Sequence, residues 1–189
     1  MSFSINVRAQ TRDIERHLKA APGAIKRAQV QALNKTGAKV NTQTVRDTAK
    51  AVGVKQKFIR ERIFFRGRLR ATKNSLEAVI LVKHAGIPSM KLGNVQSKRA
   101  RKGRRGGAGI KVGKHYYPHG FVAQMPNGKW LAVQRKGRAR LPLEELKVKI
   151  IPHAEQAAQR ALRSVGRREY PIELERALKF QLSKIRSKR

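Results

Sequence analysis

The stretch AIKRAQVQALNKTGAKVNTQTVRDTAKA (residues 24–51) decides the fold, because no proline interrupts it. Pro22 suits a helix start, where a missing N–H costs nothing, and Gly53 suits a helix end. Within the stretch, apolar or small residues recur at spacings of three and four, which places them on one helical face: Val30, Leu33, Gly37, Val40 and Thr44. The sequence therefore predicts a long helix. Since this face is narrow and rich in small residues, we expect it to pack on a neighbouring subunit as well as on its own core.

Strand patterns follow this helix along the chain. Short helices are predicted over residues 13–18 and 55–63. Residues 65–70 alternate, with Phe65, Gly67 and Leu69 on one face and arginines on the other, which is typical of a strand. A turn at 73–75 leads to a partner strand over 76–83.

A hairpin and further helices are predicted after residue 120. Residues 121–125 and 130–134 flank an Asn-Gly turn, the strongest short-range hairpin signal. Two helical faces follow, and Pro171 is expected to start the second helix, within residues 166–189. The fold class is therefore predicted as α+β, in a single domain over residues 1–189, with a long N-terminal helix, an antiparallel sheet of about four strands and C-terminal helices.

The charge of the chain is its second informative property. It has 45 Lys and Arg against 11 Asp and Glu, a formal net charge of +34. Solubility alone needs only about 2–8 charges, so we expect a polyanionic partner, most simply nucleic acid. A basic protein without a specific partner is the alternative. No acid lies between Glu77 and Glu144, so the excess is greatest in the middle third.

Residues 85–114 differ in kind from the rest, because glycine and clustered charge occur together there. This composition predicts a long basic loop or extension. Candidate contacts to a DNA backbone come from this loop and from the arginines of the predicted strand: Arg66, Arg68, Arg70, Lys98, Arg99, Arg101, Lys102, Arg104 and Arg105. The competing interpretations are a solvated strand face and a charged loop without an ordered partner. Paired aromatics for stacking bases are missing, so contacts should go to the backbone and should not read sequence.

Enzyme chemistry is not predicted. His115 and His119 have the spacing of a helical metal pair, but Pro118 opposes a helix and no Cys, Asp or Glu lies nearby. Glu144 and Glu145 are too few to hold Mg²⁺ for a nuclease. We therefore expect no cofactor, no metal and no catalytic residue. The absence of cysteine favours an intracellular or virion-interior location, and no stretch is apolar enough for a membrane span or a secretory signal.

Several motifs together resemble a known family. They are the strand Phe121–Met125, the Asn127-Gly128 turn, the segment Trp130 to Arg135, and the stretch Arg140-Leu141-Pro142-Leu143-Glu144-Glu145-Leu146. The helical run from Ala28 to Thr36 adds to them. These features resemble the prophage minor tail protein Z family, the tail-completion proteins of lambda-like phages, over roughly residues 10–165.

The resemblance implies a structural role at the head–tail joint and in the neck of the virion. It implies a homo-oligomeric ring, six-fold like the tail tube, around double-stranded DNA, with neck and tail-terminator proteins as neighbours. It implies a location in the virion after assembly in the host cytoplasm, with no membrane partner. The alternative that the composition leaves open is a ribosome-associated or nucleoid-type binding protein.

Overall fold

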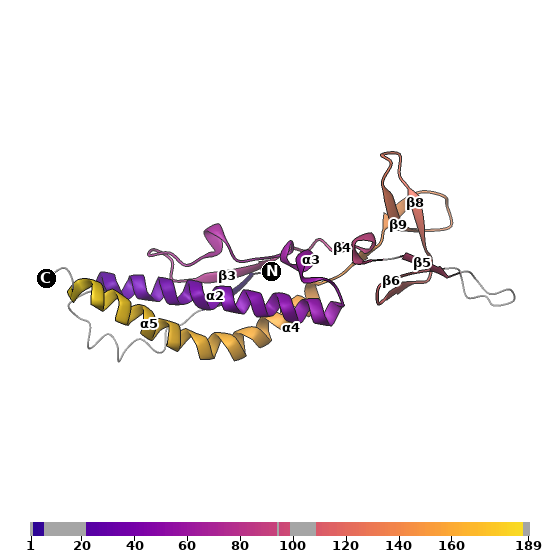
Figure 1. The fold of residues 1–189 in the computed structure, drawn as a ribbon. Coiled ribbons are helices and arrows are strands. Elements are labelled where there is room, and N and C mark those ends of the chain that lie inside the picture. Colours follow the sequence, from indigo (N-terminus) through magenta and orange to yellow (C-terminus); the bar gives the residue numbers. More distant parts are fainter. Residues whose placement is uncertain (1, 6–21, 94, 99–108, 187–189) are drawn as a thin grey trace.

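The computed structural model describes residues 2–5, 22–93, 95–98 and 109–186, and the helix predicted over 13–18 lies outside them. The molecule is elongated (Figure 1). Its longer part, the body, combines long helices with a small sheet, and its shorter part, the head, is built of β-hairpins. Each part has a hydrophobic core cluster of its own. The fold class is α+β, as predicted, but the strands of the described residues form four small antiparallel sheets instead of one.

Helix α2 (Pro22–Val52) is the long predicted helix. It ends before Gly53, whose φ of +72° closes the helix while its N–H donates to the Ala49 carbonyl. A row of small or β-branched side chains at every fourth position is buried along its whole length: Ala24, Ala28, Ala32, Thr36, Val40, Thr44, Thr48 and Val52. Such short side chains let neighbouring elements approach the helix closely. The buried surface is wider than predicted because elements of the same chain cover α2 on two sides.

One continuous helical rod covers one side of α2. It consists of α4 (Ile151–Ala161), a π-helical turn (Leu162–Gly166) and α5 (Arg167–Arg186). The predicted helix start at Pro171 is therefore wrong, because Pro171 lies inside α5. A proline in a helix interior removes one backbone hydrogen bond. Here the buried face of α5 on either side of it, including Tyr170 and Leu174, packs into the body core and keeps the chain helical.

The contact between α2 and α5 contains a buried carboxylate. Glu173 is 3% exposed, and one of its oxygens accepts hydrogen bonds from Lys39 Nζ at 2.7 Å and from Arg176 at 3.2 Å. Lys39 also donates to Glu169 at 2.8 Å, and Lys35 Nζ lies 3.5 Å from the second oxygen of Glu173. The hydrogen bond from Lys39 outweighs burial and holds the pKa of Glu173 below its usual value. Charge pairing therefore joins these two helices in addition to apolar packing.

A three-stranded sheet covers the other side of α2 (Figure 1). Its central strand is β3 (Ala78–Val82), flanked by β1 (Ser2–Ile5) and β2 (Ile63–Phe64). Burial alternates along β3, and its inward residues join the body core. The short helix α3 (Gln56–Arg60), within its predicted range, connects α2 to β2.

The strand predicted over residues 65–70 is wrong. The chain is extended only as far as Arg66, and Gly67 then takes a φ of +59°. Residues Gly67–Leu69 form a single 3-10 turn. Glycine adopts positive φ at little cost, so the strand alternation stops at Gly67.

The described parts of the loop predicted over residues 85–114 contain strands and a 3-10 turn. Strand β4 (Ile87–Pro88) pairs with β11 (Lys147–Val148) and joins the body to the head. A 3-10 turn (Ser89–Leu92) follows, and the buried Ser89 hydroxyl donates to the Leu146 carbonyl at 2.8 Å. Residues 99–108 of the predicted loop lie outside the described residues.

The head contains two three-stranded sheets. The first joins β5 (Val95–Lys98), β6 (Gly109–Val112) and β7 (His115–Tyr117). The second joins β8 (Gly120–Gln124), β9 (Trp130–Arg135) and β10 (Leu143–Glu145). Between the sheets lies the head core: Ile110, Val112, Ala132 and Leu146. The β8–β9 hairpin confirms the prediction from the Asn-Gly turn, in which Gly128 has a φ of +76°.

The close packing of β6 against β7 leads to a testable prediction about the stability of the head. A Cβ atom on Gly109 would lie 2.5 Å from the Tyr117 carbonyl oxygen, a backbone atom that cannot move without disturbing the sheet. Replacement Gly109→Ala should therefore destabilise the protein by about 1–3 kcal/mol, measured by urea unfolding. Gly137→Ala is the matched control, because a Cβ there meets nothing within 4 Å. Equal stability of the two variants would contradict this packing.

Candidate functional site

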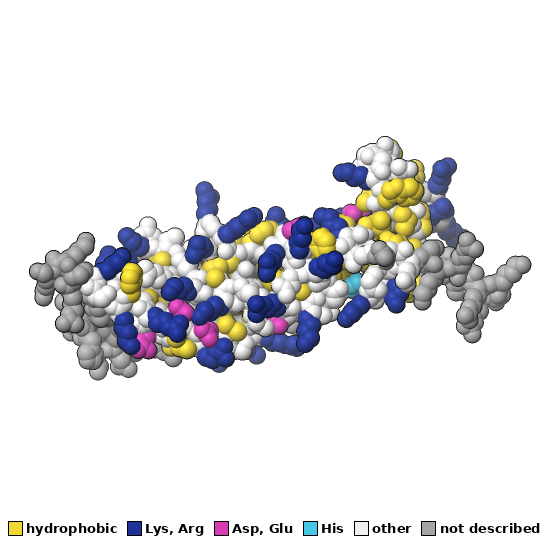
Figure 2. All heavy atoms as spheres, in the orientation of Figure 1, with side chains coloured by type: hydrophobic (Ala, Val, Ile, Leu, Met, Phe, Trp, Pro, Cys, Tyr) yellow, Lys and Arg dark blue, Asp and Glu magenta, His cyan; other side chains and the backbone are white. Residues whose placement is uncertain are grey.

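Lysine and arginine side chains are spread along the molecular face seen in Figure 2, with few acidic side chains among them. Three of the acids of the body are already engaged by lysine or arginine, namely Glu169, Glu173 and Glu175. The body therefore has far more cations than carboxylates to pair them. A site for an anion must be sought where such cations converge on a shaped surface.

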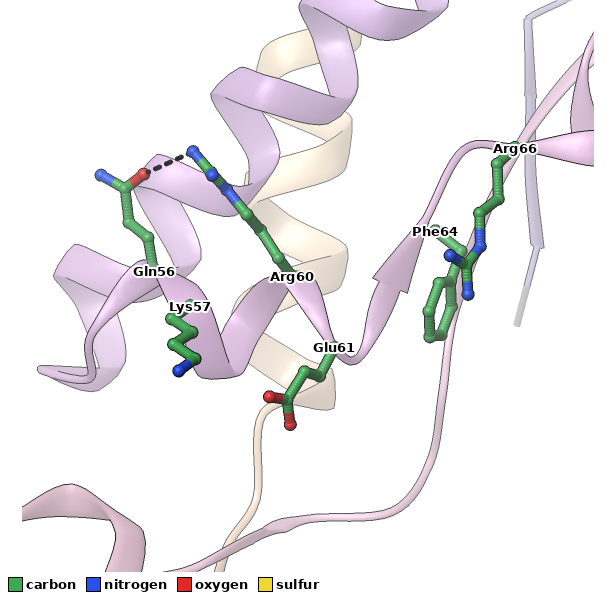
Figure 3. Close-up of a pocket in the computed structure, with 6 residues that line it drawn as sticks. All are labelled: Gln56, Lys57, Arg60, Glu61, Phe64 and Arg66. Atoms are coloured by element: carbon green, nitrogen blue, oxygen red, sulfur yellow. Dashed lines mark hydrogen bonds between the residues drawn. The ribbon is translucent and has the colours of Figure 1, made fainter.

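One such place is an open depression of about 570 Å³ on the body, between α3 and the start of the sheet. We call it the α3 notch. Six residues line it, as Figure 3 shows: Gln56, Lys57, Arg60, Glu61, Phe64 and Arg66. The burial of Ile59 fixes α3 on the core and leaves Lys57 and Arg60 exposed on its outer side. Arg60 is steadied by a hydrogen bond of 3.5 Å to Gln56, one turn earlier in the helix.

An aromatic ring organises the other side of the notch. Ile63 is buried in the core, and Phe65 packs against Gly37 of α2, so the extended chain turns Phe64 outward. The Arg66 guanidinium lies 5.2 Å from the centre of the Phe64 ring, and the Lys83 ammonium lies 4.8 Å from it. Cation–π attraction holds both charges in place. Because cations already cover this ring, it is poorly placed to stack on a base.

One carboxylate, Glu61, lines the notch beside the cations, but among the described residues it forms no ion pair with them. Among the residues that the structure describes, no carboxylate lies within 4.0 Å of the charged groups of Lys57, Arg66 or Lys83. The adjacent Arg62 has a buried Nε without a hydrogen-bond partner. Cations without a paired carboxylate at a shallow surface are suited to binding phosphate groups.

The structure does not bring the predicted arginines into one row. Arg66 lines the α3 notch, whereas Arg70 lines a second depression, of about 530 Å³, beside Lys35 and Arg176 where α2 meets α5. Arg68 lies between them, exposed in the 3-10 turn. The positive φ of Gly67 separates Arg66 from the other two arginines, so they cannot follow a phosphate backbone as a regular strand ladder.

The predicted basic cluster of the loop cannot be located in the same way. The backbone of Lys98 closes strand β5 opposite Gly109. The other five members lie outside the described residues: Arg99, Arg101, Lys102, Arg104 and Arg105. They remain predicted contacts.

Sequence reasoning missed most of the α3 notch. Lys57 and Arg60 carry a detectable signal, because they are three residues apart and flank the buried Ile59. Lys83 carries none, since it reaches Phe64 only through the pairing of β2 with β3. Phe64 could be assigned an outward position only once Phe65 was known to face α2.

The histidines and helices of the described part of the chain bear on two other kinds of site. No three His, Cys, Asp or Glu residues gather there in an arrangement that could hold a metal ion. His115 instead makes a hydrogen bond of 3.0 Å between its Nε2 and the Val52 carbonyl oxygen, which links head to body. The described helices include none with the length and apolar character of a membrane span.

Comparison with known proteins shows which sequences this chain is similar to. The chain is 27% identical over 174 residues to tail completion protein Z of Escherichia phage lambda, covering 86% of this chain and 87% of the relative. It is 29% identical over 128 residues to the tail completion protein of Escherichia phage N15, covering 66% and 68% of the two chains. No solved structure matches. The sequence model of the prophage minor tail protein Z family matches residues 12–188, and the chain therefore belongs to this family.

Proposed function

We propose that this chain is a tail-completion protein of a lambda-like phage or prophage, needed before a tail can join a filled head. The observation that carries this proposal is the family match over residues 12–188. Both relatives are named as tail completion proteins. The role is structural, without a catalytic residue or cofactor, and the protein resides in the tail or neck of the virion after assembly in the host cytoplasm.

A homo-oligomeric ring, six-fold like the tail tube, is part of this proposal. The elongated body offers a long lateral surface for contact between copies. On α5, Ile172 and Phe180 are 39% and 49% exposed, which makes this helix a candidate subunit contact. Copies that each carry +34 repel one another unless a polyanion or acidic neighbours lie between them.

Double-stranded DNA in the channel of this ring is the polyanion that we propose. The cations of the α3 notch, with Arg68, Arg70 and the cluster from Lys98 to Arg105, would contact its phosphates. Two features support backbone contact rather than base reading: unpaired cations, and an aromatic ring that is already covered by cations. Neck and tail-terminator proteins are the proposed protein neighbours.

Deletion and complementation test the tail-completion role. A phage that lacks this coding sequence should make filled heads and tails but should not join them into infectious particles. The intact sequence supplied in trans should restore the yield, whereas a frameshifted copy should not. Joined, infectious virions from the deletion phage would overturn the proposal.

Particle mass tests the ring separately. In mass photometry with short duplex DNA, we expect a single protein assembly with six times the 21.3 kDa of the monomer. Negative-stain images should show rings. A uniform monomer that sediments with ribosomes would favour the ribosome-associated alternative instead.

A further inference from the structure

The second sheet of the head has an unusual second face. In β8–β9–β10, directly opposed residues point to the same side of the sheet. On one side, Gly120 and Ala132 pack on the head core, while Val122 and Trp130, nearer the hairpin turn, are exposed. The other side carries two charged residues, Arg135 and Glu145, and five apolar ones: Phe121, Ala123, Leu131, Val133 and Leu143. We call this surface the outer face. An antiparallel sheet that covers a core on one side normally presents polar residues on the other.

The outer face belongs to neither core. None of its five apolar residues is a member of the body or head core cluster of the described residues. Val133 is shielded to 2% exposure, while the four apolar residues around it are half-buried. Nearby, Leu141 is 67% exposed in the connection between β9 and β10. Hydrophobic side chains also gather on the head in Figure 2. Apolar sheet surfaces of this kind mark contact sites for other macromolecules.

The charges around the outer face identify the kind of partner. The guanidinium of Arg135 lies 5.8 Å from the centre of the Phe121 ring, and three exposed cations follow it in the β9–β10 connection: Lys136, Arg138 and Arg140. Within the described residues, no carboxylate lies within 4.0 Å of these four side chains. Glu145, the acid on this side of the sheet, is already paired with Lys147 at 2.9 Å. The surface is thus an apolar strip with a positive rim.

We infer that the outer face docks an acidic protein of the tail, one that presents an apolar strip flanked by Asp and Glu. A second copy fits poorly, because it would place one positive rim against another on chains that each carry +34. Duplex DNA fits poorly, because the apolar strip offers no donors to phosphate oxygens. The inference rests on the proposed function in one respect, that the tail carries this partner.

Tails assembled by the deletion phage serve as the probe, in a sedimentation assay with purified protein. The wild-type chain should sediment with these tails, and two variants should each bind at least tenfold more weakly: Leu131→Ser, which breaks the strip, and the double charge reversal Arg138→Glu with Arg140→Glu. Matched controls are Leu76→Ser, which replaces an exposed leucine outside the outer face, and Lys26→Glu with Lys50→Glu on α2. Both controls should bind like the wild type. The charge-reversal pair lies on exposed positions, so it keeps the test decisive if Leu131→Ser does not fold.

Four results would overturn this inference. In the first, the wild-type chain fails to sediment with tails although it complements the deletion. In the second, both variants bind tails like the wild type. In the third, Leu131→Ser breaks up the homo-oligomer, and in the fourth, Leu131→Ser weakens duplex binding tenfold. The third would assign the outer face to a second copy, and the fourth to DNA. Failure of the wild-type chain to complement would count against the proposed function instead.

Discussion

Neutralising the α3 notch should make DNA binding much weaker and less sensitive to salt. The triple variant Lys57→Gln, Arg60→Gln and Arg66→Gln removes three of the cations that line it. Each lost phosphate contact flattens the slope of log affinity against log salt by about 0.9. The slope should therefore fall by up to about 2.7, and affinity at 0.1 M salt by on the order of 10²-fold. Fluorescence anisotropy with a labelled duplex from 50 to 200 mM salt measures both quantities.

A matched triple variant separates the notch from net charge. Lys136→Gln, Arg138→Gln and Arg140→Gln also removes three exposed cations, but from the head. Because we assign the head loop to a protein partner, the slope of log affinity against log salt for this second triple variant should stay close to that of the wild type. Equal losses in the two triple variants would mean that DNA responds only to total charge, and the notch would have no special role.

The basic cluster of residues 99–105 needs its own variant. Replacing Arg99, Arg101, Arg104 and Arg105 by Gln should flatten the slope further if the cluster contacts phosphate. If its effect adds to that of the notch variant, two separate parts of the chain contact the same DNA. An unchanged slope would limit the DNA surface to the body.

The elements that the sequence predicts well are those with local causes. Helix α2 follows from an uninterrupted run between Pro22 and Gly53, and the head hairpin follows from Asn127-Gly128 between two β-rich segments. The fold class needs only these elements and their order. The motifs that resemble the family are also local, so they can be recognised in the sequence without knowledge of the fold.

The wrong predictions share a different cause, since each depends on contacts distant in sequence. The alternation of residues 65–70 has the period of a strand, but Phe65 is drawn against Gly37 and Gly67 turns the chain away. Pro171 has the character of a helix start, but packing on α2 carries the helix through it. The notch was missed for the same reason, since Lys83 meets Phe64 only after β2 and β3 have paired.

The structure also separates the excess positive charge into two groups of cations, one on the body and one on the head, whereas the sequence shows only the total. On the body, cations gather around an aromatic ring without an ion-paired carboxylate among the described residues, an arrangement that would suit a phosphate backbone. On the head, cations surround an apolar strip, as a protein partner would require. Under the proposed function, the chain would meet these two kinds of neighbour at different places along its length.

Replacing Glu173 by alanine should strongly destabilise the body. The carboxylate is 3% exposed and accepts charge-assisted hydrogen bonds from Lys39 and Arg176, so its loss should cost about 2 kcal/mol. Urea unfolding at pH 7 measures this difference. Glu175→Ala is the control, because Glu175 is exposed and its pairing with exposed Lys179 should contribute under about 1 kcal/mol.

The same carboxylate should govern stability in acid. Because the hydrogen bond from Lys39 holds the pKa of Glu173 below the ordinary value of 4.5, folding favours its ionised form. That contribution is complete above pH 4.5 and is lost as pH falls below it toward the lowered pKa of the folded state. Glu169, whose pKa the same lysine lowers, adds to the effect. Unfolding free energies from pH 5 to pH 3 should therefore fall more steeply for the wild type than for Glu173→Ala. Parallel curves would show that the Lys39 bridge contributes nothing to the joining of α2 and α5.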